Sequence, residues 1–482
     1  MSFQRFREES LVGFAQNLTD FCKEIRPDIT VTHQFSPMLH GWFLGQSDKI
    51  AKASDYCSGD FYGDKIQQRF GVKGFDALTT HKPFEFMTSR CVSLYDHTSS
   101  KCDEELILSA LTTLAGGGAY FFIDAINPDG TLDGSFYDRL KKINEYLTPY
   151  REIVKKNRFH ITGNVGLYFS MVSCVDINLN GTELDRYTPG SSSNMSVRKN
   201  AVLDETLASA ELLTEMHIPY RVVTDSTIDY SGFKTIIVHN SSYLSLDICE
   251  RLREFVRRGG NLIVTGATGI YDYKGNHYDS FALSDVMGVD FLWEYSPRVN
   301  YTGKELILSD GEAPLGKLTG AKPLEYFNFP IYSIDDPYKY ASIHSNPPGK
   351  ATEFPAITEN KFGKGKCLWI AAPFILKKQY TQKEFAKKLY KKYIECPIET
   401  DLPYSVELTS LLGNNKKAVC VVNMQDQYPP LPIFERYIVI ETEKPKRITK
   451  ASDGLEALWE YTGGKVKITI DKLSFAEFFV IE

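Results

Sequence analysis

The sequence predicts an α/β fold that ends in a smaller all-β part. From the start of the chain to about residue 400, short apolar runs alternate with segments whose apolar residues recur at helical spacing, which is the rhythm of a parallel sheet. After residue 401 the apolar runs are short and alternating, and proline and glycine clusters separate them, which is typical of antiparallel strands. These observations divide the chain into residues 1–158, 159–400 and 401–482.

The first part begins with a helix and continues with strands. Leu11, Phe14, Leu18 and Phe21 have the spacing of an amphipathic helix, which we expect over residues 7–25. We expect strands over residues 29–33, 56–60, 84–88 and 119–123, and a further helix over residues 136–150. Strand followed by helix is the pattern of a parallel β/α sheet.

The second part repeats the alternation of strands and helices. The pair Gly259-Gly260 ends one of the helices, as glycine after a last helical turn commonly does. We expect strands over residues 165–170, 221–224, 235–239, 261–265 and 366–371, and helices over residues 202–217 and 245–258. Five such strands predict a doubly wound, flavodoxin-like sheet, and the Tyr-, Asn-, Gly- and Pro-rich residues 270–365 indicate a β-rich insertion.

The third part contains alternating apolar runs without helical periodicity. We expect strands over residues 405–412, 417–423, 437–441, 466–470 and 475–481. Short antiparallel strands of this kind predict a small β-sandwich.

Composition and charge argue against several classes of protein. A net charge of −6 without concentrated basic segments gives no electrostatic footprint for nucleic acid, so we expect no such partner. The charged amino terminus and the lack of a long apolar run predict neither a signal peptide nor a membrane anchor, and we expect a cytoplasmic protein. The nine cysteines are scattered and never form a C-x-x-C pair, which predicts neither a disulfide framework nor a structural zinc site.

Several motifs resemble known glycoside hydrolases. The Gly116–Gly118 turn, the apolar run 119–123, the segment Asn127-Pro-Asp-Gly-Thr131 and the following helix resemble the last strand and helix of alpha-L-fucosidase-like hydrolases. The segment Phe84–Ser89 is similar to their preceding strand. From about residue 160 the chain resembles the flavodoxin-like trimerisation domain and the small carboxyl-terminal β domain of family 42 β-galactosidases. The resemblance implies a carbohydrate substrate, a homo-oligomer, specifically a trimer, and no cofactor.

The resemblance also implies an incomplete barrel. A complete (β/α)8 barrel, the TIM barrel, needs about 250 residues, whereas the barrel-like region here ends near residue 158. The chain is therefore expected to contain the carboxyl-terminal half of the barrel, from its fifth strand to its eighth. Half a barrel would expose two sheet edges and an apolar interior.

Glu85 is the candidate catalytic residue. Glycoside hydrolysis usually needs two carboxyl groups, which barrel enzymes place at the carboxyl ends of their strands. Glu85 interrupts the apolar run from Phe84 to Met87, where an unpaired carboxylate would be costly, so a functional role explains it well. The nucleophile of family 42 enzymes lies on the seventh strand, and the resemblance therefore implies that Glu85 is the nucleophile.

Two other roles for Glu85 stay open. Its carboxylate could bind substrate hydroxyls, or it could form a structural ion pair with an arginine or lysine. The resemblance implies that the second catalytic carboxylate lies near the fourth strand, upstream of residue 1.

Six further side chains are candidates for substrate binding. Asp60 and Tyr62 lie in an acidic, glycine-containing segment that suits hydroxyl binding and ring stacking, although a polar turn is the alternative. His33 ends a predicted strand and could equally be structural. The full set is His33, Trp42, Asp60, Tyr62, Asp96 and Asp124. No calcium-loop pattern is present, and we expect no metal.

Other activities fit the sequence poorly. An amidotransferase would need a nucleophilic cysteine at a tight elbow, whereas the third strand of the second part ends in His239-Asn240-Ser241. The glycine pattern at residues 266–269 is too incomplete for dinucleotide binding. We therefore expect a hydrolase of terminal sugars, acting on a β-galactoside or an α-L-fucoside. The alternative is a non-catalytic carbohydrate-binding or assembly protein.

Overall fold

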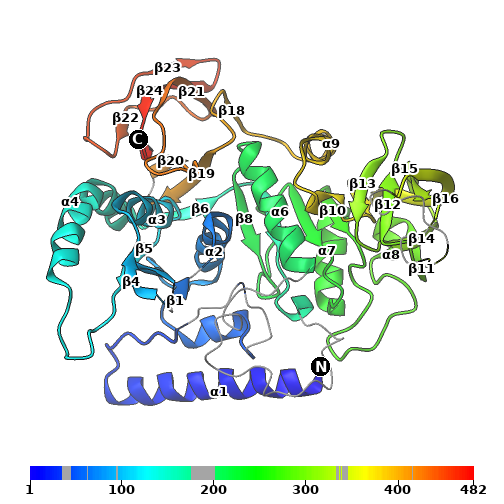
Figure 1. Ribbon diagram of the computed structural model, residues 1–482, viewed down its shortest axis with the longest axis horizontal. Coiled ribbons are helices and arrows are strands. Elements are labelled where there is room, and N and C mark those ends of the chain that lie inside the picture. Colours follow the sequence, from blue (N-terminus) through cyan, green and yellow to red (C-terminus); the bar gives the residue numbers. More distant parts are fainter. Residues whose placement is uncertain are drawn as a thin grey trace.

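The protein has a mixed α/β fold with three sets of sheets along the chain (Figure 1). The computed structural model describes residues 1–34, 39, 45–61, 63–93, 96–174, 201–332, 336, 338, 346–414 and 416–482. A three-stranded parallel sheet comes first, a nine-stranded sheet follows, and two antiparallel sheets end the chain.

The first sheet consists of parallel strands in the order β1-β2-β5. Its strands are β1 (Ser58–Phe61), β2 (Glu85–Ser89) and β5 (Ala119–Ile123), and its helices are α2 (Lys65–Leu78), α3 (Asp103–Ala115) and α4 (Gly134–Asn157). The three strands confirm the sequence prediction within two residues, and α4 contains the predicted helix over residues 136–150 but extends to Asn157. A hairpin of β3 (Cys91–Ser93) and β4 (Asp96–Ser100) follows β2.

The helices α2 and α3 were not predicted. Two glycines interrupt the periodicity of α2, and α3 buries residues on most of its circumference, so neither shows one apolar stripe. Local signals did exist, because Asp64 and Gln67 form a capping box at the start of α2. Three acidic residues in the first turn of α3 are likewise favourable next to the helix dipole.

The predicted strand over residues 29–33 is wrong. These residues form no regular strand, and a single parallel bridge joins Gln34 to Ser58. Side chains hold this segment, since the Val31 N–H donates to Asp55 Oδ2 at 2.7 Å and the His33 N–H donates to Ser54 Oγ at 3.0 Å. The segment connects α1 (Ser2–Ile25) to the rest of the first sheet, and η2 (Asp48–Ala53) lies against α1.

The second sheet contains the predicted doubly wound strands. Its parallel strands run in the order β8-β7-β9-β10-β17, which is the 2-1-3-4-5 order of flavodoxin-like sheets. They are β7 (Val165–Tyr168), β8 (Tyr220–Val223), β9 (Thr235–His239), β10 (Asn261–Thr265) and β17 (Gly365–Ile370). The helices α6 (Ala201–Glu215), α7 (Leu246–Arg258) and α9 (Tyr380–Tyr390) accompany this sheet.

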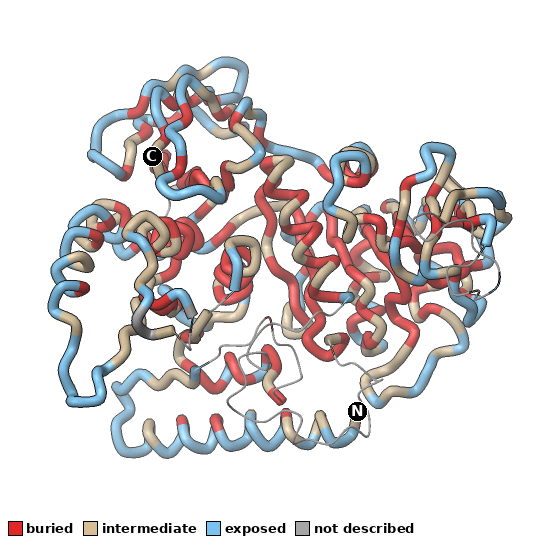
Figure 2. Tube along the Cα trace, viewed as in Figure 1, coloured by how far each residue is buried: buried red, intermediate tan, exposed pale blue. Residues whose placement is uncertain are grey.

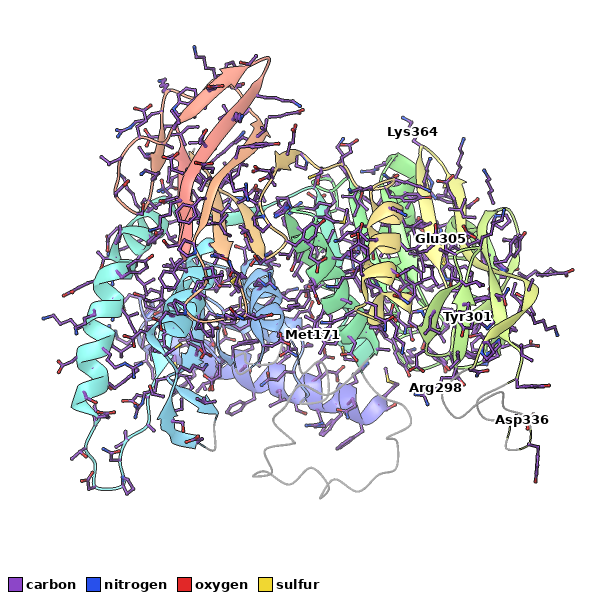
Figure 3. The ribbon with its side chains drawn as sticks, turned by 45° about the horizontal axis from the view of Figure 1, so that its top comes forward. Met171, Arg298, Tyr301, Glu305, Asp336 and Lys364 are labelled. Atoms are coloured by element: carbon purple, nitrogen blue, oxygen red, sulfur yellow. The ribbon has the colours of Figure 1, made fainter. Side chains whose placement is uncertain are left out.

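The predicted β-rich insertion is confirmed, and it extends the second sheet. Antiparallel strands continue from β17 in the order β16, β15, β12, β13. The insertion contains α8 (Ser284–Met287), β11 (Val289–Tyr295), β12 (Val299–Thr302), β13 (Ile307–Asp310), β14 (Pro314–Leu318), β15 (Lys322–Pro330) and β16 (Pro348–Phe362). Arg298, Tyr301 and Glu305 of this extension lie on the opposite side of the molecule from α4 (Figure 3).

Two antiparallel sheets form the last part of the chain, as predicted. One has the order β18-β21-β24-β23 and the other the order β22-β25-β20-β19-β6. The strands are β6 (His160–Thr162), β18 (Ile398–Thr400), β19 (Val406–Gly413), β20 (Lys416–Asn423), β21 (Ile433–Glu441), β22 (Ile448–Lys450), β23 (Trp459–Thr462), β24 (Lys465–Leu473) and β25 (Ala476–Ile481). β6 follows α4 directly and pairs with β19, so the last sheet also contains a strand from outside residues 401–482.

A buried ion pair also connects the first and last parts. Lys73 of α2 pairs with Glu407 of β19, and the exposed fractions of their side chains are 4% and 5%. Arg69 Nε lies 3.8 Å from the other carboxylate oxygen of Glu407. Charges this deeply buried are tolerated only when they are paired, so the two parts depend on each other's side chains.

We expect Glu407→Gln to destabilise the protein, because Lys73 would stay buried beside a neutral amide. The expected loss in free energy of unfolding is about 3–5 kcal/mol, measured by urea denaturation. Glu254→Gln is the matched control, since Glu254 lies on the surface of α7 and pairs with the exposed Arg257 and Arg258. Equal losses in the two variants would contradict the role given to the buried pair.

Candidate active site

The first sheet has one face covered by helices and one face turned away from them. The Phe86 ring packs against Phe61 and against Phe75 of α2, with centroids 5.2 and 5.5 Å apart, so Phe86 points to the covered face. Successive strand residues point to opposite faces, and cross-strand partners share a face. The opposite face, called the inner face below, therefore carries Ser58, Asp60, Glu85, Met87, Ala119 and Phe121.

Glu85 lies on the inner face but at the amino-terminal end of its strand. It is the first residue of β2 and is half-buried, and its Oε2 accepts a hydrogen bond from Ser58 Oγ at 2.8 Å. A cavity of about 490 Å³ adjoins it, lined in part by Tyr56, His81 and Arg158. Burial and the nearby Glu85 carboxylate raise the pKa of Tyr56.

This position differs from the one that barrel enzymes use. Their catalytic groups lie at the carboxyl ends of the strands, which for β2 means Thr88 and Ser89. The predicted strand over residues 84–88 had Glu85 near its amino-terminal end, and the structure agrees. Its assignment as nucleophile stays a prediction.

Asp60 also lies on the inner face, two residues closer than Glu85 to the carboxyl ends of the strands. It is half-buried, and it lies opposite Met87 in the register of β1 and β2. The predicted stacking residues Trp42 and Tyr62 lie outside the described residues. Asp60 and Glu85 are thus the two acidic side chains of the inner face in the part of the sheet that the structure describes.

His33 lies in a structural network. Its Nε2 is 2.8 Å from Thr19 Oγ1, and that hydroxyl donates its hydrogen to the Ala53 carbonyl at 2.7 Å. Because a threonine hydroxyl has one hydrogen, His33 donates to Thr19 from Nε2. This arrangement anchors α1 to His33 and to the last residue of η2, and it favours the structural role over the predicted substrate contact.

Asp124 and Asp96 also have protein partners. Arg90, directly after β2, forms a buried ion pair with Asp124, directly after β5, and its Nη1 lies 3.3 Å from Asp133 Oδ2. Asp124 Oδ1 accepts a further hydrogen bond from the Ala125 N–H at 2.7 Å. Asp96 Oδ1 accepts from the Ser99 N–H at 2.9 Å, which is turn geometry. Arg90 is the residue that the sequence reasoning missed at the carboxyl end of the sheet.

A larger cavity of about 820 Å³ lies where the three parts of the chain meet. It has polar and aromatic walls, and the residues that line it include Lys65, Lys101, Glu211, Tyr404 and Tyr428. Lys65 Nζ lies 4.5 Å from the centroid of the Tyr428 ring, and burial lowers the pKa of Lys65. No sequence motif could have indicated this cavity, because its walls are far apart along the chain.

The carboxyl edge of the second sheet contains a buried polar network. His239 Nε2 lies 2.6 Å from Ser209 Oγ, and His239 Nδ1 lies 3.6 Å from Glu205 Oε2. The order serine, histidine, carboxylate resembles that of a catalytic triad. His239 and Ser209 are nevertheless fully buried and Glu205 is 1% exposed, so no substrate reaches them. We assign this network to stability.

Two acidic residues, Asp48 and Asp225, lie where η2 meets the second sheet. Asp225 accepts hydrogen bonds from the hydroxyls of Tyr168 and Tyr273. Asp48 of η2 accepts from Thr224 Oγ1 at 3.0 Å and from the Ser226 N–H at 2.7 Å. Burial, together with the Asp48 charge, raises the pKa of Asp225 to about 7.

In the residues that the structure describes, no group of three or more His, Cys, Asp or Glu side chains is placed to hold a metal ion. The same residues include no helix with the length and apolar character needed to cross a bilayer.

Solved structures share this fold, and they are barrel-type glycosidases. The alpha-L-fucosidase isoenzyme 2 from Paenibacillus thiaminolyticus aligns with 98% of this chain and 71% of its own, with a TM-score of 0.73 and 15% identity. The β-galactosidase from Bacillus circulans sp. alkalophilus aligns with 99% of this chain and 67% of its own, with a TM-score of 0.71 and 16% identity. At this identity the likeness is one of fold.

Two regions of the chain match known protein families. Residues 1–123 match the family described as Beta-galactosidase, and residues 195–397 match the family described as Beta-galactosidase trimerisation domain. These matches confirm the predicted resemblance to family 42 β-galactosidases.

The curated relatives that match this chain at low identity are also β-galactosidases. The β-galactosidase Pbg of Clostridium perfringens is 21% identical over 470 residues, and the β-galactosidase bgaB of Geobacillus kaustophilus is 27% identical over 151 residues. The aligned regions span 64% and 20% of these relatives, so this chain spans less than two thirds of either length.

The raised pKa of Asp225 predicts a pH dependence of stability. A carboxyl group with a higher pKa in the folded state binds more protons when folded, so its contribution is present at low pH and is lost as pH rises from about 4 to about 7. We expect the free energy of unfolding of the wild type, relative to Asp225→Asn, to fall by roughly 2–4 kcal/mol between pH 4.5 and pH 8. Urea denaturation at both pH values measures this difference, and equal pH dependence in the two proteins would contradict it.

Proposed function

We propose that this chain is part of a glycoside hydrolase that releases terminal sugars, joined to an assembly domain. In this proposal residues 1–158 supply four β/α units of a (β/α)8 barrel. Residues 159–400 form the flavodoxin-like trimerisation domain, and residues 401–482 form a β-sandwich. The order of the two family matches along the chain supports this division.

The observation that supports this proposal most directly is the arrangement of acidic side chains on the inner face of the first sheet. It presents Asp60 and Glu85 on neighbouring parallel strands of a sheet that matches a β-galactosidase family. Glycosidases cleave through an oxocarbenium-like transition state, which one carboxylate stabilises or attacks while another carboxyl group protonates the leaving oxygen. We propose Glu85 as a catalytic carboxylate and Asp60 as a ligand of sugar hydroxyls. The substrate is a β-galactoside or an α-L-fucoside.

The hydrogen bond from Ser58 supports this role. It fixes one oxygen of Glu85, so the carboxylate has a defined orientation without a cationic partner among the contacts that the structure shows. A carboxylate held in this way keeps its second oxygen for a ligand. The proposed second catalytic carboxyl group comes from the barrel units that complete the sheet.

The match to a trimerisation family supports a further part of the proposal. We propose that the second sheet and its insertion, which lie within residues 195–397 over most of their length, assemble copies of this chain into a homotrimer.

A second candidate function is a non-catalytic carbohydrate-binding or assembly protein. The position of Glu85 at the amino-terminal end of β2 favours it, because barrel enzymes keep their reacting groups at the other end. In that case Glu85 contributes to the structure through Ser58 and takes no part in hydrolysis.

Hydrolysis of aryl β-galactosides and α-L-fucosides tests the activity. We expect turnover that falls by roughly 10²–10⁴-fold in Glu85→Gln, because the amide keeps the size and the hydrogen bond but loses the charge. Asp129→Asn is the matched control, since Asp129 lies exposed in the loop before α4 and should leave turnover unchanged.

Two results would count against the enzyme proposal. Turnover that persists in Glu85→Gln would remove Glu85 from the catalytic machinery. Turnover that is absent from a chain shown to be folded would favour the carbohydrate-binding or assembly protein.

A further inference from the structure

The cavity of about 820 Å³, called the junction cavity below, lies on the covered face of the first sheet. Phe61 and Thr88 line it, and they are cross-strand partners near the carboxyl ends of β1 and β2. Thr88 follows Phe86 by two residues, so both side chains point to the covered face, whereas Glu85 points to the inner face. The junction cavity and the candidate catalytic carboxylate therefore lie on opposite faces of the sheet.

All three parts of the chain contribute walls to the junction cavity. Gln68 and Ser109 come from α2 and α3, Glu211 comes from α6, and Tyr404 and Tyr428 come from the last part. The helices α2, α3 and α6 are largely buried (Figure 2), and Gln68 Nε2 donates to Ser109 Oγ at 2.6 Å. Small-molecule sites are usually preformed cavities of about 300–1,000 Å³, and the junction cavity fits this description.

The charged side chains of the junction cavity are already paired. The walls contain four cationic side chains, and each of them lies close to a carboxylate. The N–O distances are 3.9 Å for Lys65 and Asp426, 3.8 Å for Arg69 and Glu407, 3.8 Å for Lys101 and Glu105, and 2.8 Å for Lys378 and Glu211. A ligand with a net charge would meet like charges as well as opposite ones, so these walls suit a neutral polar ligand.

Two tyrosine rings give the junction cavity a partly aromatic wall. Lys387 Nζ lies 4.2 Å from the centroid of the Tyr404 ring, and Lys65 Nζ lies 4.5 Å from that of Tyr428. The exposed fractions of Tyr404 and Tyr428 are 63% and 36%. An ammonium group occupies one face of a ring, and the exposed remainder can contact the apolar face of a ligand such as a sugar.

Lys101 adds a hydrogen-bond donor whose contacts within the protein are long. Its side chain is 18% exposed, and its Nζ lies 3.5 Å from Thr88 Oγ1 and 3.8 Å from Glu105 Oε1. Both distances exceed the roughly 2.7–2.9 Å of a charge-assisted hydrogen bond. Burial lowers the pKa of Lys101, which shows that its charge is poorly solvated. A ligand hydroxyl would offer this ammonium group a closer acceptor.

We propose that the junction cavity binds a neutral oligosaccharide, separately from any sugar on the inner face. Sugars combine hydroxyl groups with apolar ring faces, which is the combination that the paired charges, amides and tyrosines of this cavity recognise. Tyr404 and Tyr428 contact the sugar rings, and Lys101 donates to a hydroxyl. Because Glu85 lies on the opposite face of the sheet, binding here does not require that the chain be a hydrolase.

Isothermal titration calorimetry of the full chain tests the site. The probes are three neutral disaccharides, lactose, cellobiose and α-1,4-galactobiose, each at up to about 10 mM. We expect saturable binding of at least one of them. We expect α-1,4-digalacturonate, which carries two carboxylates, to bind more weakly than the best neutral sugar. The affinity should be the same in Glu85→Gln, which also prevents hydrolysis of the probe if Glu85 is catalytic.

Substitutions in the walls show where the sugar binds. Tyr428→Ala and Tyr404→Ala should each weaken binding of the best sugar by roughly tenfold, because each removes a ring. Tyr428→Phe keeps the ring and should retain binding, whereas Lys101→Met should weaken it. Tyr338→Ala is the matched control, since Tyr338 is 91% exposed and bonds to Asp336, far from α4 (Figure 3). Urea denaturation shows that each variant is folded.

Four results would overturn the proposal. They are no saturable binding of any of the three neutral sugars, binding that is undiminished in both Tyr404→Ala and Tyr428→Ala, tighter binding of digalacturonate than of the neutral sugars, and binding that is lost in Glu85→Gln. The last result would place the sugar on the inner face. Binding that depends on Tyr428 in a chain without turnover would support the junction cavity as a sugar site and contradict the hydrolase function.

Discussion

The open parallel sheet is the constraint on which the rest of this structure depends. Parallel β/α sheets are stable when both faces are covered and when no long edge is left unpaired. Here the strands β1, β2 and β5 have helices on one face only, and β5 ends the sheet without a neighbour in the described residues.

The incomplete sheet is held by the other two parts. The buried pair of Lys73 and Glu407 links α2 to the last sheets, and β6 continues from α4 into one of them. Asp48 of η2 binds residues that follow β8 of the second sheet. The first part is thus fixed to the other two parts by specific polar contacts and by one shared strand.

Much of the fold could be predicted from local patterns. Runs such as Thr235–His239 and Asn261–Thr265 are apolar, short and bounded by turns, and the structure places strands at those residues. The segment at residues 29–33 has the same apolar character but forms no strand, because the side chains of Asp55 and Ser54 accept the hydrogen bonds of the Val31 and His33 N–H groups. The local pattern of apolar residues does not encode these side-chain contacts.

The chemical type of the candidate site could be predicted from the sequence. The contacts of its residues could be predicted only in part. A carboxylate in an apolar strand indicated a functional or specially bonded position for Glu85, and the structure shows its hydrogen bond with Ser58 and its place on the inner face. The pairing of Arg90 with Asp124 could not be predicted, because it joins two loops that meet only through the order of the strands. The same holds for the hydrogen bond between Thr19 and His33, which connects α1 to a residue predicted to bind substrate.

The most direct test of this account is amide hydrogen exchange of the unmodified chain, compared strand by strand. The account predicts that Tyr120 and Phe122 of β5 exchange far faster than the amides of β9 and β10, which lie in the middle of the second sheet. Exchange at β5 as slow as at β9 would contradict the account, because it would show that the first sheet is already closed in the chain as it stands.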